Sequence, residues 1–383
     1  MIPYSRQDIS QEDIDSVAHV LKSDFLTQGE MVPKFENAIS NKVGVNHSIC
    51  VNSATSALHI ACLALGLGKG DTLWTSPNTF VASANCALYC GAQVDFVDID
   101  LATHNMSADA LLDKLKNIKS QDQIPKIVVP VSFSGRSSDM KKIYNLSKKY
   151  NFKVIEDASH SIGGKYYSEM IGSCRYSDIT VFSFHPVKII TSGEGGMALT
   201  NKSDLAKKMM LLRTHGITRN KEELLNNSQD PWYYEQLTLG FNYRMSDLHA
   251  ALGFSQLKRL DFFVQKRQEI AKYYDRALKD LPIILPKESL DSAYHLYVIQ
   301  IDNRKTSITR SRLFEYMRSK GIGVNVHYIP VHTHPFYKKK GFKEGDFPNS
   351  EKFYQNAISL PIFPSIDKKQ LKMVVLSLEE ILS

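Results

Sequence analysis

Apolar and polar positions along the chain predict strands and helices that take turns. "HSICVNS" (residues 47–53) is a β-branched run, and the overlapping "SATSALHIACLALGL" has apolar residues at helical spacing. The same alternation recurs in "DTLWTS", "TFVASANCALYCG" and "QVDFVDID", and again in "KIVVPVSF", "DMKKIYNLSKKY" and "FKVIEDAS". Continuous apolar strands separated by helices indicate a mostly parallel sheet with both faces covered, which is the α/β class.

The pattern changes near Asn242. "MSDLHAALGFSQLKRLDFFVQKRQEIAKYYDRAL" predicts one long helix through Leu278, and "AYHLYVIQI", "TRSRLFEYMRSKG" and "IGVNVHY" then predict strand, helix and strand. We therefore expect three parts in this chain. They are an N-terminal arm or helix that packs on the small domain (1–29), a large α/β domain (30–241), and a long helix with a smaller α+β domain (242–383).

Composition and charge narrow the class of protein. The chain has 383 residues, of which 43% are hydrophobic and 23% charged, as in globular proteins and unlike disordered or fibrous ones. Its net charge of +7 favours anionic small molecules, and the scattered basic residues give no indication of nucleic acid. The first residues lack an apolar signal core, and no apolar run approaches the roughly 20 residues that span a bilayer. We expect a cytoplasmic protein without a membrane partner.

The five cysteines do not form a recognisable pattern. Their number is odd and no two of them make a CxxC pair. This argues against a disulfide framework and against a structural zinc site, so we expect no bound metal.

Two motifs place polar residues where strands end. "NSATSALH" (52–59) opens a helix with small and hydroxyl residues, which is typical of a phosphate site but also of an ordinary helix cap. "VIEDASHS" ends a strand with Asp157, whose carboxylate can pair with a protonated ring nitrogen or simply cap a helix. His160 follows three residues later and either binds the same ligand or packs in the core.

Lys188, in "FSFHPVK", completes the pattern. A buried lysine has a lowered pKa and becomes a nucleophilic amine, whereas a lysine in a solvated turn does not. An amine for an aldehyde, a carboxylate for a ring nitrogen and a helix start for a phosphate are what pyridoxal phosphate requires. Ser183 adds a hydroxyl to the phosphate site. The order of these three signals on an α/β pattern predicts that cofactor.

Taken together, these motifs resemble the DegT/DnrJ/EryC1 family of sugar-nucleotide aminotransferases. The resemblance runs through "IPYSRQDIS", "LTQGEMVPKFE", "NSATSALH", "SPNTFVAS", "EDASHSIGG", "FSFHPVK", "GEGG", "RTHG", "NYRMSDLHAALG", "VHYIP" and "LPIFP", and so covers essentially the whole chain. It implies the type I fold of pyridoxal phosphate-dependent transferases, as in aspartate aminotransferase. It also implies a homodimer with a shared active site.

The resemblance implies a role for each matching residue. Lys188 would hold the cofactor covalently and move the proton, Asp157 would pair with the ring nitrogen, and His160 would lie near the cofactor hydroxyl. Phe80 would lie over the face of the cofactor ring. The phosphate would be bound by Ala54, Thr55 and Ser183, together with Asn242 from the partner subunit.

Several segments look most like one branch of the family. That branch aminates the 4-keto group of UDP-4-keto-6-deoxy-N-acetyl-altrosamine precursors on the route to pseudaminic acid, with L-glutamate as the expected donor. The matching substrate positions are Tyr4, Asp24, Phe25, Leu26, Thr27, His327 and Tyr328, along with Ala54, Ser183 and Asn242. A polar insert, "KEELLNNSQDPWYYEQ" (221–236), departs from relatives near a substrate-facing loop.

Four other functions are compatible with parts of the sequence pattern. Sister enzymes aminate other UDP- or dTDP-linked 4-keto sugars. Some family members have histidine in place of the lysine and eliminate a hydroxyl group from the sugar. This chain has a lysine, Lys188, at the matching position, which argues against elimination. A non-catalytic sensor on the same fold would not need that lysine. A nucleotide-binding oxidoreductase is disfavoured because no GxGxxG follows the first strand.

Overall fold

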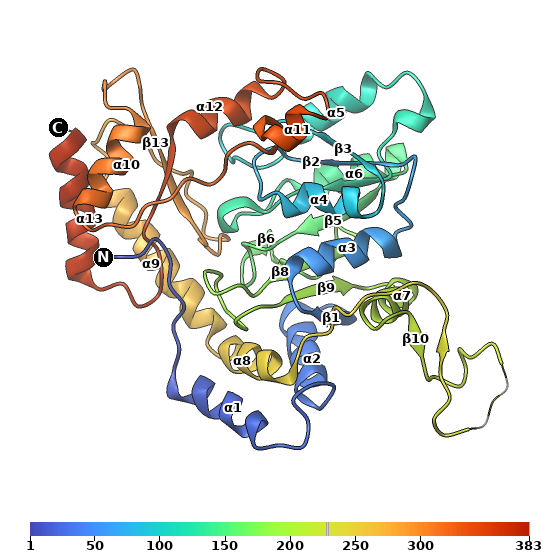
Figure 1. The fold of residues 1–383 in the computed structure, drawn as a ribbon. Helices are drawn as coiled ribbons and strands as arrows, with labels where there is room; N and C mark the ends of the chain where they lie inside the picture. The colour runs from blue at the N-terminus through green and yellow to red at the C-terminus, as the bar shows by residue number, and fades with distance from the viewer. Residues whose placement is uncertain (227, 229, 383) are drawn as a thin grey trace.

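A computed structural model describes residues 1–226, 228 and 230–382. A seven-stranded sheet with the order β1-β9-β8-β5-β4-β2-β3 lies at its centre (Figure 1). Its strands are β1 (His47–Val51), β2 (Thr72–Thr75), β3 (Gln93–Phe96), β4 (Ile127–Val129), β5 (Lys153–Asp157), β8 (Ile179–Ser183) and β9 (Gly196–Thr200). Only β9 runs antiparallel to its two neighbours, so the predicted α/β class and mostly parallel sheet are confirmed.

Helices cover both faces of this sheet, because its strands are apolar on both sides. One face packs against α3 (Ala54–Ala64), α4 (Ala82–Tyr89) and α7 (Ser203–Arg213). On the other face, α5 (Ala108–Lys116) and α6 (Met140–Tyr150) cover one end. The other end is covered by α2 (Met31–Val43) and α8 (Asp247–Leu257).

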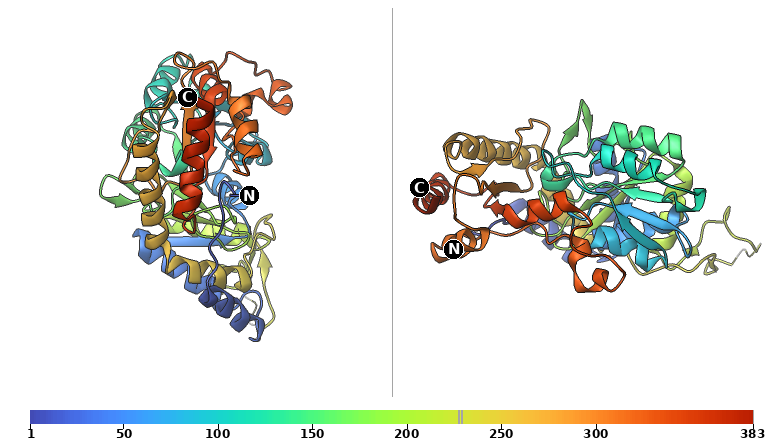
Figure 2. Two further views of the ribbon diagram at one scale, coloured as in Figure 1. Left: turned by 90° about the vertical axis from the view of Figure 1, so that its left-hand side faces the viewer. Right: turned by 90° about the horizontal axis from the view of Figure 1, so that it is seen from above.

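A smaller layer of helices and strands follows toward the C-terminus (Figures 1 and 2). A three-stranded antiparallel sheet packs against three helices; these elements are β12 (Ile283–Ile284), β13 (Tyr297–Ile301), β14 (Ala357–Leu360), α9 (Leu260–Ala277), α10 (Arg310–Ser319) and α13 (Lys368–Leu382). The expected strand in "IGVNVHY" is wrong, because this segment makes only isolated bridges at Ile322 and Asn325. The division of the chain into three domains stays a prediction.

The remaining elements are short or peripheral. They are α1 (Gln11–Leu21), β6 (Lys165–Tyr166), β7 (Glu169–Met170), β10 (Ile217–Thr218), β11 (Glu235–Gln236), α11 (Pro335–Lys338) and α12 (Pro348–Asn356). The N-terminal arm contacts both the C-terminal layer and a helix that covers the seven-stranded sheet. Ile2 pairs with Ile322, and α1 packs on α8. None of the helices described here is long and apolar enough to cross a membrane.

The single long helix predicted after Asn242 is also wrong. It is two helices, α8 and α9, that meet at Lys258 and Arg259. The Arg259 guanidinium donates to the Asp8 carboxylate at 2.7 Å and to the Asp13 carboxylate at 2.6 Å. Ion pairs with the N-terminal arm thus accompany the change of direction, and local periodicity could not indicate them.

A buried carboxylate joins the start of α8 to the start of α2. Asp247 accepts the backbone N–H groups of Gly29 and, at 2.9 Å, Val32. We expect Asp247→Ala to lower the free energy of unfolding by about 3 kcal/mol, because one buried and one partly buried backbone donor lose a charged acceptor. Urea denaturation measures this loss. Asp247→Asn keeps one carbonyl oxygen and should lose less; equal stability of Asp247→Ala and the parent would contradict the assignment.

Candidate functional site

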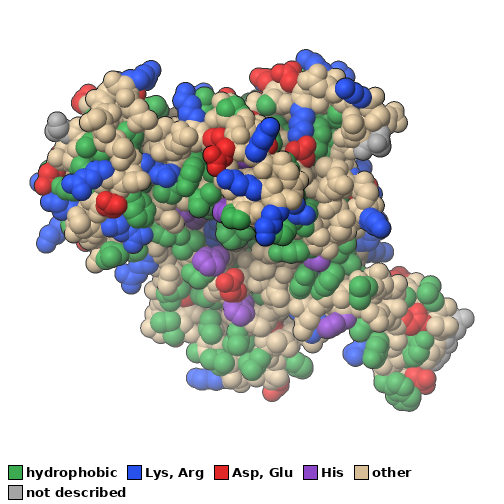
Figure 3. Space-filling model, turned by 45° about the horizontal axis from the view of Figure 1, so that its top comes forward, with side chains coloured by type: hydrophobic (Ala, Val, Ile, Leu, Met, Phe, Trp, Pro, Cys, Tyr) green, Lys and Arg blue, Asp and Glu red, His purple; other side chains and the backbone are tan. Residues whose placement is uncertain are grey.

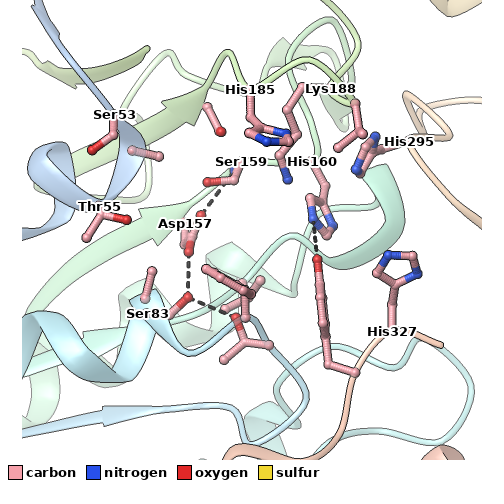
Figure 4. A pocket seen from close by; sticks show the side chains of 18 of the residues that line it. Ser53, Thr55, Ser83, Asp157, Ser159, His160, His185, Lys188, His295 and His327 are labelled. Atoms are coloured by element: carbon pink, nitrogen blue, oxygen red, sulfur yellow. Dashed lines mark hydrogen bonds between the residues drawn. The ribbon is translucent and has the colours of Figure 1, made fainter. Parts of the chain in front are cut away.

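A cavity of about 460 Å³ lies beyond the carboxyl ends of β5 and β8, between the large sheet and the C-terminal layer. Figure 3 shows histidine side chains in the hollowed middle of one face, and Figure 4 shows several of the lining residues. Ten predicted site residues line it: Tyr4, Ala54, Thr55, Phe80, Asp157, His160, Ser183, Lys188, His327 and Tyr328. Their individual roles remain predictions.

Asp157 is the last residue of β5 and its carboxylate is held from two sides. The Ser83 hydroxyl, from α4, donates to Oδ2 at 2.6 Å, and the Ser159 backbone N–H donates to Oδ1 at 3.1 Å. Asp157 is 5% exposed, and these two bonds fix the orientation of its carboxylate. The site therefore contains an oriented, buried carboxylate.

Lys188 lies five positions beyond the end of β8, in the loop that returns as β9. Burial lowers the pKa of its amine to about 8, while the negative charge of Asp157 acts in the opposite direction. Backbone bonds close this loop, with Phe184 N–H donating to the Gly195 carbonyl at 2.9 Å. The fold therefore supplies an amine with a far larger neutral fraction near physiological pH than an ordinary lysine has, as nucleophilic or basic chemistry requires.

The start of α3 forms an anion cradle in the same cavity. Ser53 caps the helix by accepting the Ser56 N–H at 3.1 Å, which leaves the first-turn amides of Ala54 and Thr55 available. At Gly196 a Cβ atom would lie 2.4 Å from the Ala54 nitrogen, so only glycine lets β9 approach so closely. A phosphate group fits this cradle, with Ser183 at the end of the neighbouring strand.

His160 joins two other parts of the structure. Its Nδ1 accepts the Ser134 backbone N–H at 3.2 Å, and its Nε2 lies 3.1 Å from the Tyr328 hydroxyl. Burial, and then the positive charge of Lys188, lower the pKa of His160 well below its usual value. The ring is therefore neutral at physiological pH.

Three residues that the sequence motifs did not indicate also line the cavity, namely Ser83, His295 and Asn325. Ser83 is the last residue of the motif "SPNTFVAS", three positions after Phe80, so its presence in the motif is a sequence signal. The hydrogen bond from its hydroxyl to Asp157 depends on the fold and has no such signal. The His295 ring lies 4.4 Å from the His160 ring, and it comes from a segment that was interpreted only as a strand. No local pattern distinguishes His295 from a core residue.

Two groups of predicted site residues, 24–27 and Asn242, lie outside the cavity of this chain. Residues 24–27 connect α1 to α2, with Phe25 63% exposed. Asn242 is exposed and its backbone pairs with Thr214. The two sets are close to each other, since Thr27 pairs with Ser246 near the start of α8. A role for Asn242 in a partner's site stays a prediction.

The donor set fits pyridoxal phosphate. Lys188 supplies an amine that can be neutral, Asp157 a carboxylate for a protonated ring nitrogen, and the α3 cradle a site for phosphate. Phe80 lines the cavity at its exposed side, with 59% of its surface accessible. An aromatic ring at this position can cover one face of a planar ligand.

Known proteins share this sequence and architecture. The profile of the DegT/DnrJ/EryC1/StrS aminotransferase family matches residues 7–379. The chain is 40% identical to UDP-4-amino-4,6-dideoxy-N-acetyl-beta-L-altrosamine transaminase of Campylobacter jejuni, covering 98% of this chain and 96% of that protein. It is also 40% identical to spore coat polysaccharide biosynthesis protein SpsC of Bacillus subtilis, covering 99% and 97%.

Solved structures extend the comparison. Helicobacter pylori PseC, an aminotransferase of pseudaminic acid biosynthesis, superposes with a TM-score of 0.90 at 32% identity, covering 100% of this chain and 99% of that one. The PLP form of the sugar aminotransferase Spr1654 from Streptococcus pneumoniae gives 0.88 at 27% identity, covering 100% of both chains. These matches confirm the predicted aminotransferase fold.

The lowered pKa of Lys188 predicts a pH dependence for cofactor capture. Only the neutral amine attacks an aldehyde, so the rate at which cofactor-free protein binds pyridoxal phosphate should rise with pH and level off above about 8. Stopped-flow absorbance measures this rate. Asp157→Asn removes the charge that raises the pKa of Lys188, so its midpoint should lie at lower pH. A midpoint near that of free lysine, or one unchanged in Asp157→Asn, would contradict this account.

Proposed function

The chain belongs to the DegT/DnrJ/EryC1/StrS aminotransferase family, and from this premise we propose that it transfers an amino group from L-glutamate to the C4 keto group of a UDP-linked 4-keto-6-deoxy-N-acetylhexosamine. It is a sugar aminotransferase that uses pyridoxal phosphate. The similarity to the Campylobacter jejuni altrosamine transaminase, which extends over nearly the whole of both chains, carries the specific proposal. We place the reaction in pseudaminic acid biosynthesis.

The residues of the cavity divide the chemistry among them. When bound, pyridoxal phosphate supplies an electron-withdrawing ring that makes the proton on the amine-bearing carbon labile. The Lys188 amine takes that proton and returns it at a different carbon, because its lowered pKa lets it act as both base and acid near neutral pH. Asp157, oriented by Ser83 and Ser159, keeps the ring nitrogen protonated. Ala54, Thr55 and Ser183 hold the phosphate.

The presence of Lys188 favours amine transfer over the other functions considered. Family members that eliminate a hydroxyl group have a histidine at the position of Lys188. In this chain Lys188 itself lines the cavity, and His185 lies three residues before it and does not replace it. A sensor protein would need neither the lowered pKa of Lys188 nor the buried carboxylate of Asp157. Amination of a different 4-keto sugar is the second candidate, because the similarity to SpsC is just as high.

A homodimer forms part of the proposal. The arm that carries β10, β11 and the insert projects from the body of the molecule (Figure 1, lower right). Leu225, Trp232 and Leu239 expose 83%, 74% and 77% of their surfaces there. Exposed apolar groups of this size favour contact with another chain. Asn242 and residues 24–27, which do not reach the cavity of their own chain, would then act in a partner's site.

The sugar specificity can be tested directly. The holoenzyme should convert glutamate and the UDP-linked 4-keto altrosamine precursor to the 4-amino sugar at least 10-fold faster than it converts dTDP-linked 4-keto-6-deoxyglucose, because binding contacts set such ratios. Mass spectrometry of the sugar nucleotides measures both rates. Lys188→Ala should form neither product and serves as the control. Preference for the dTDP sugar would overturn the pseudaminic acid assignment and leave the aminotransferase activity intact.

The shared site predicts complementation between two inactive variants. In a mixed dimer of Lys188→Ala with Asn242→Ala, one site would contain the intact lysine of one chain and the intact asparagine of the other. After unfolding and refolding in equal amounts, the mixture should regain about a quarter of parent activity, since half the dimers are mixed and each has one intact site. Activity is measured as above. A mixture no more active than Asn242→Ala refolded alone would contradict the shared site.

A further inference from the structure

The hydrogen bonds of His160 determine which of its ring nitrogens carries the proton. Ser134 has the left-handed φ of 63°, and its backbone N–H points to Nδ1 at 3.2 Å. A backbone N–H can only donate, so Nδ1 accepts and is unprotonated. The neutral ring therefore carries its proton on Nε2. The low pKa of His160, which follows from burial and the nearby charge of Lys188, agrees with a neutral ring.

This tautomer sets the direction of the next hydrogen bond. Nε2 lies 3.1 Å from the Tyr328 hydroxyl, and because Nε2 carries the proton, His160 donates and the phenol oxygen accepts. The proton of the Tyr328 hydroxyl has no acceptor among the described residues, and Tyr328 lines the cavity. Burial raises the pKa of Tyr328, so the hydroxyl keeps this proton.

The fold maintains the arrangement from outside the cavity. The Ser134 hydroxyl donates to the Leu296 carbonyl at 2.7 Å. At the next residue, Gly135, a Cβ atom would lie 2.6 Å from the Tyr294 nitrogen, so the loop after β4 packs closely against the segment before β13. That segment also places the His295 ring against His160. The position of the Ser134 N–H is therefore fixed by backbone packing.

We propose that Tyr328 donates its hydroxyl proton in a hydrogen bond to the anionic ring oxygen of bound pyridoxal phosphate, and that Ser134 and His160 orient it for this role. In this cofactor the ring oxygen is attached next to the carbon that bears the aldehyde, so it lies beside the Lys188 amine. His160 lies close enough to Lys188 to respond to its charge. The family resemblance places His160 near this oxygen, whereas the structure assigns the donated proton to Tyr328.

The proposal rests on the role of Lys188 but not on the identity of the sugar. A hydrogen bond to the ring oxygen would stabilise its negative charge and so weaken the attraction between that charge and the proton on Lys188 Nζ, when Nζ is bonded to the cofactor. Removing the bond should raise the pH at which that nitrogen titrates. The other titratable groups that line the cavity stay the same in the variant used; they are Asp157, Glu194, Tyr4, His185, His295 and His327, besides His160 and Lys188 themselves.

The test is a pH titration of the visible absorbance band of the holoenzyme, without amino donor or sugar. In Tyr328→Phe we expect the midpoint to move upward by about one pH unit, the effect of losing one hydrogen bond to a charged oxygen. The band itself shows that the variant has folded and bound the cofactor. A midpoint equal to that of the parent would overturn the proposal.

Tyr4→Phe is the matched control. It removes a phenol from the wall of the same cavity, and the Tyr4 hydroxyl makes no bond to His160 among the described residues. Its midpoint should equal that of the parent; a shift as large as in Tyr328→Phe would show that any lost phenol has this effect and would also overturn the proposal. No sugar is present, so failure of the sugar assignment would leave the result unchanged.

Discussion

The site depends on Lys188, a half-buried lysine that lines the cavity, and on the Asp157 carboxylate that lines it too. Burial alone would make the ammonium form costly, and the charge of Asp157 offsets part of that cost. The balance leaves the pKa of Lys188 at about 8, where both protonation states are populated under physiological conditions. Fixing Asp157 through Ser83 and Ser159 therefore also fixes the chemistry of the lysine.

The histidines around the cavity follow from the same constraint. Burial lowers the pKa of His160, His295 and His327, and the positive charge of Lys188 lowers each of them further. Neutral imidazoles provide hydrogen bonds without competing with the lysine for the negative charge of Asp157. The cavity thus has many polar groups, yet its positive charge is concentrated at the reacting amine.

The sequence could predict those parts of the site that depend on the ends of neighbouring strands. Asp157 and Ser183 end adjacent parallel strands, so an apolar run followed by a polar residue was enough to bring them together. The break between α8 and α9 could not be predicted, because Arg259 bonds to Asp8 and Asp13 at the far end of the chain. His295 was missed for a related reason: its place beside His160 comes from tertiary packing of the C-terminal layer.

The diphosphate of a nucleotide sugar needs cationic or strongly polar donors. The described residues that line this cavity provide few of them. Among the described residues that line it, Lys188 is the only lysine or arginine, and its amine is committed to the reaction. A diphosphate leaves water only where charged or strongly polar donors replace its hydration. The α3 cradle is already assigned to the phosphate of the cofactor. Donors for the diphosphate must therefore come from beyond the residues that line this cavity, and the homodimer proposed above would be one source of them.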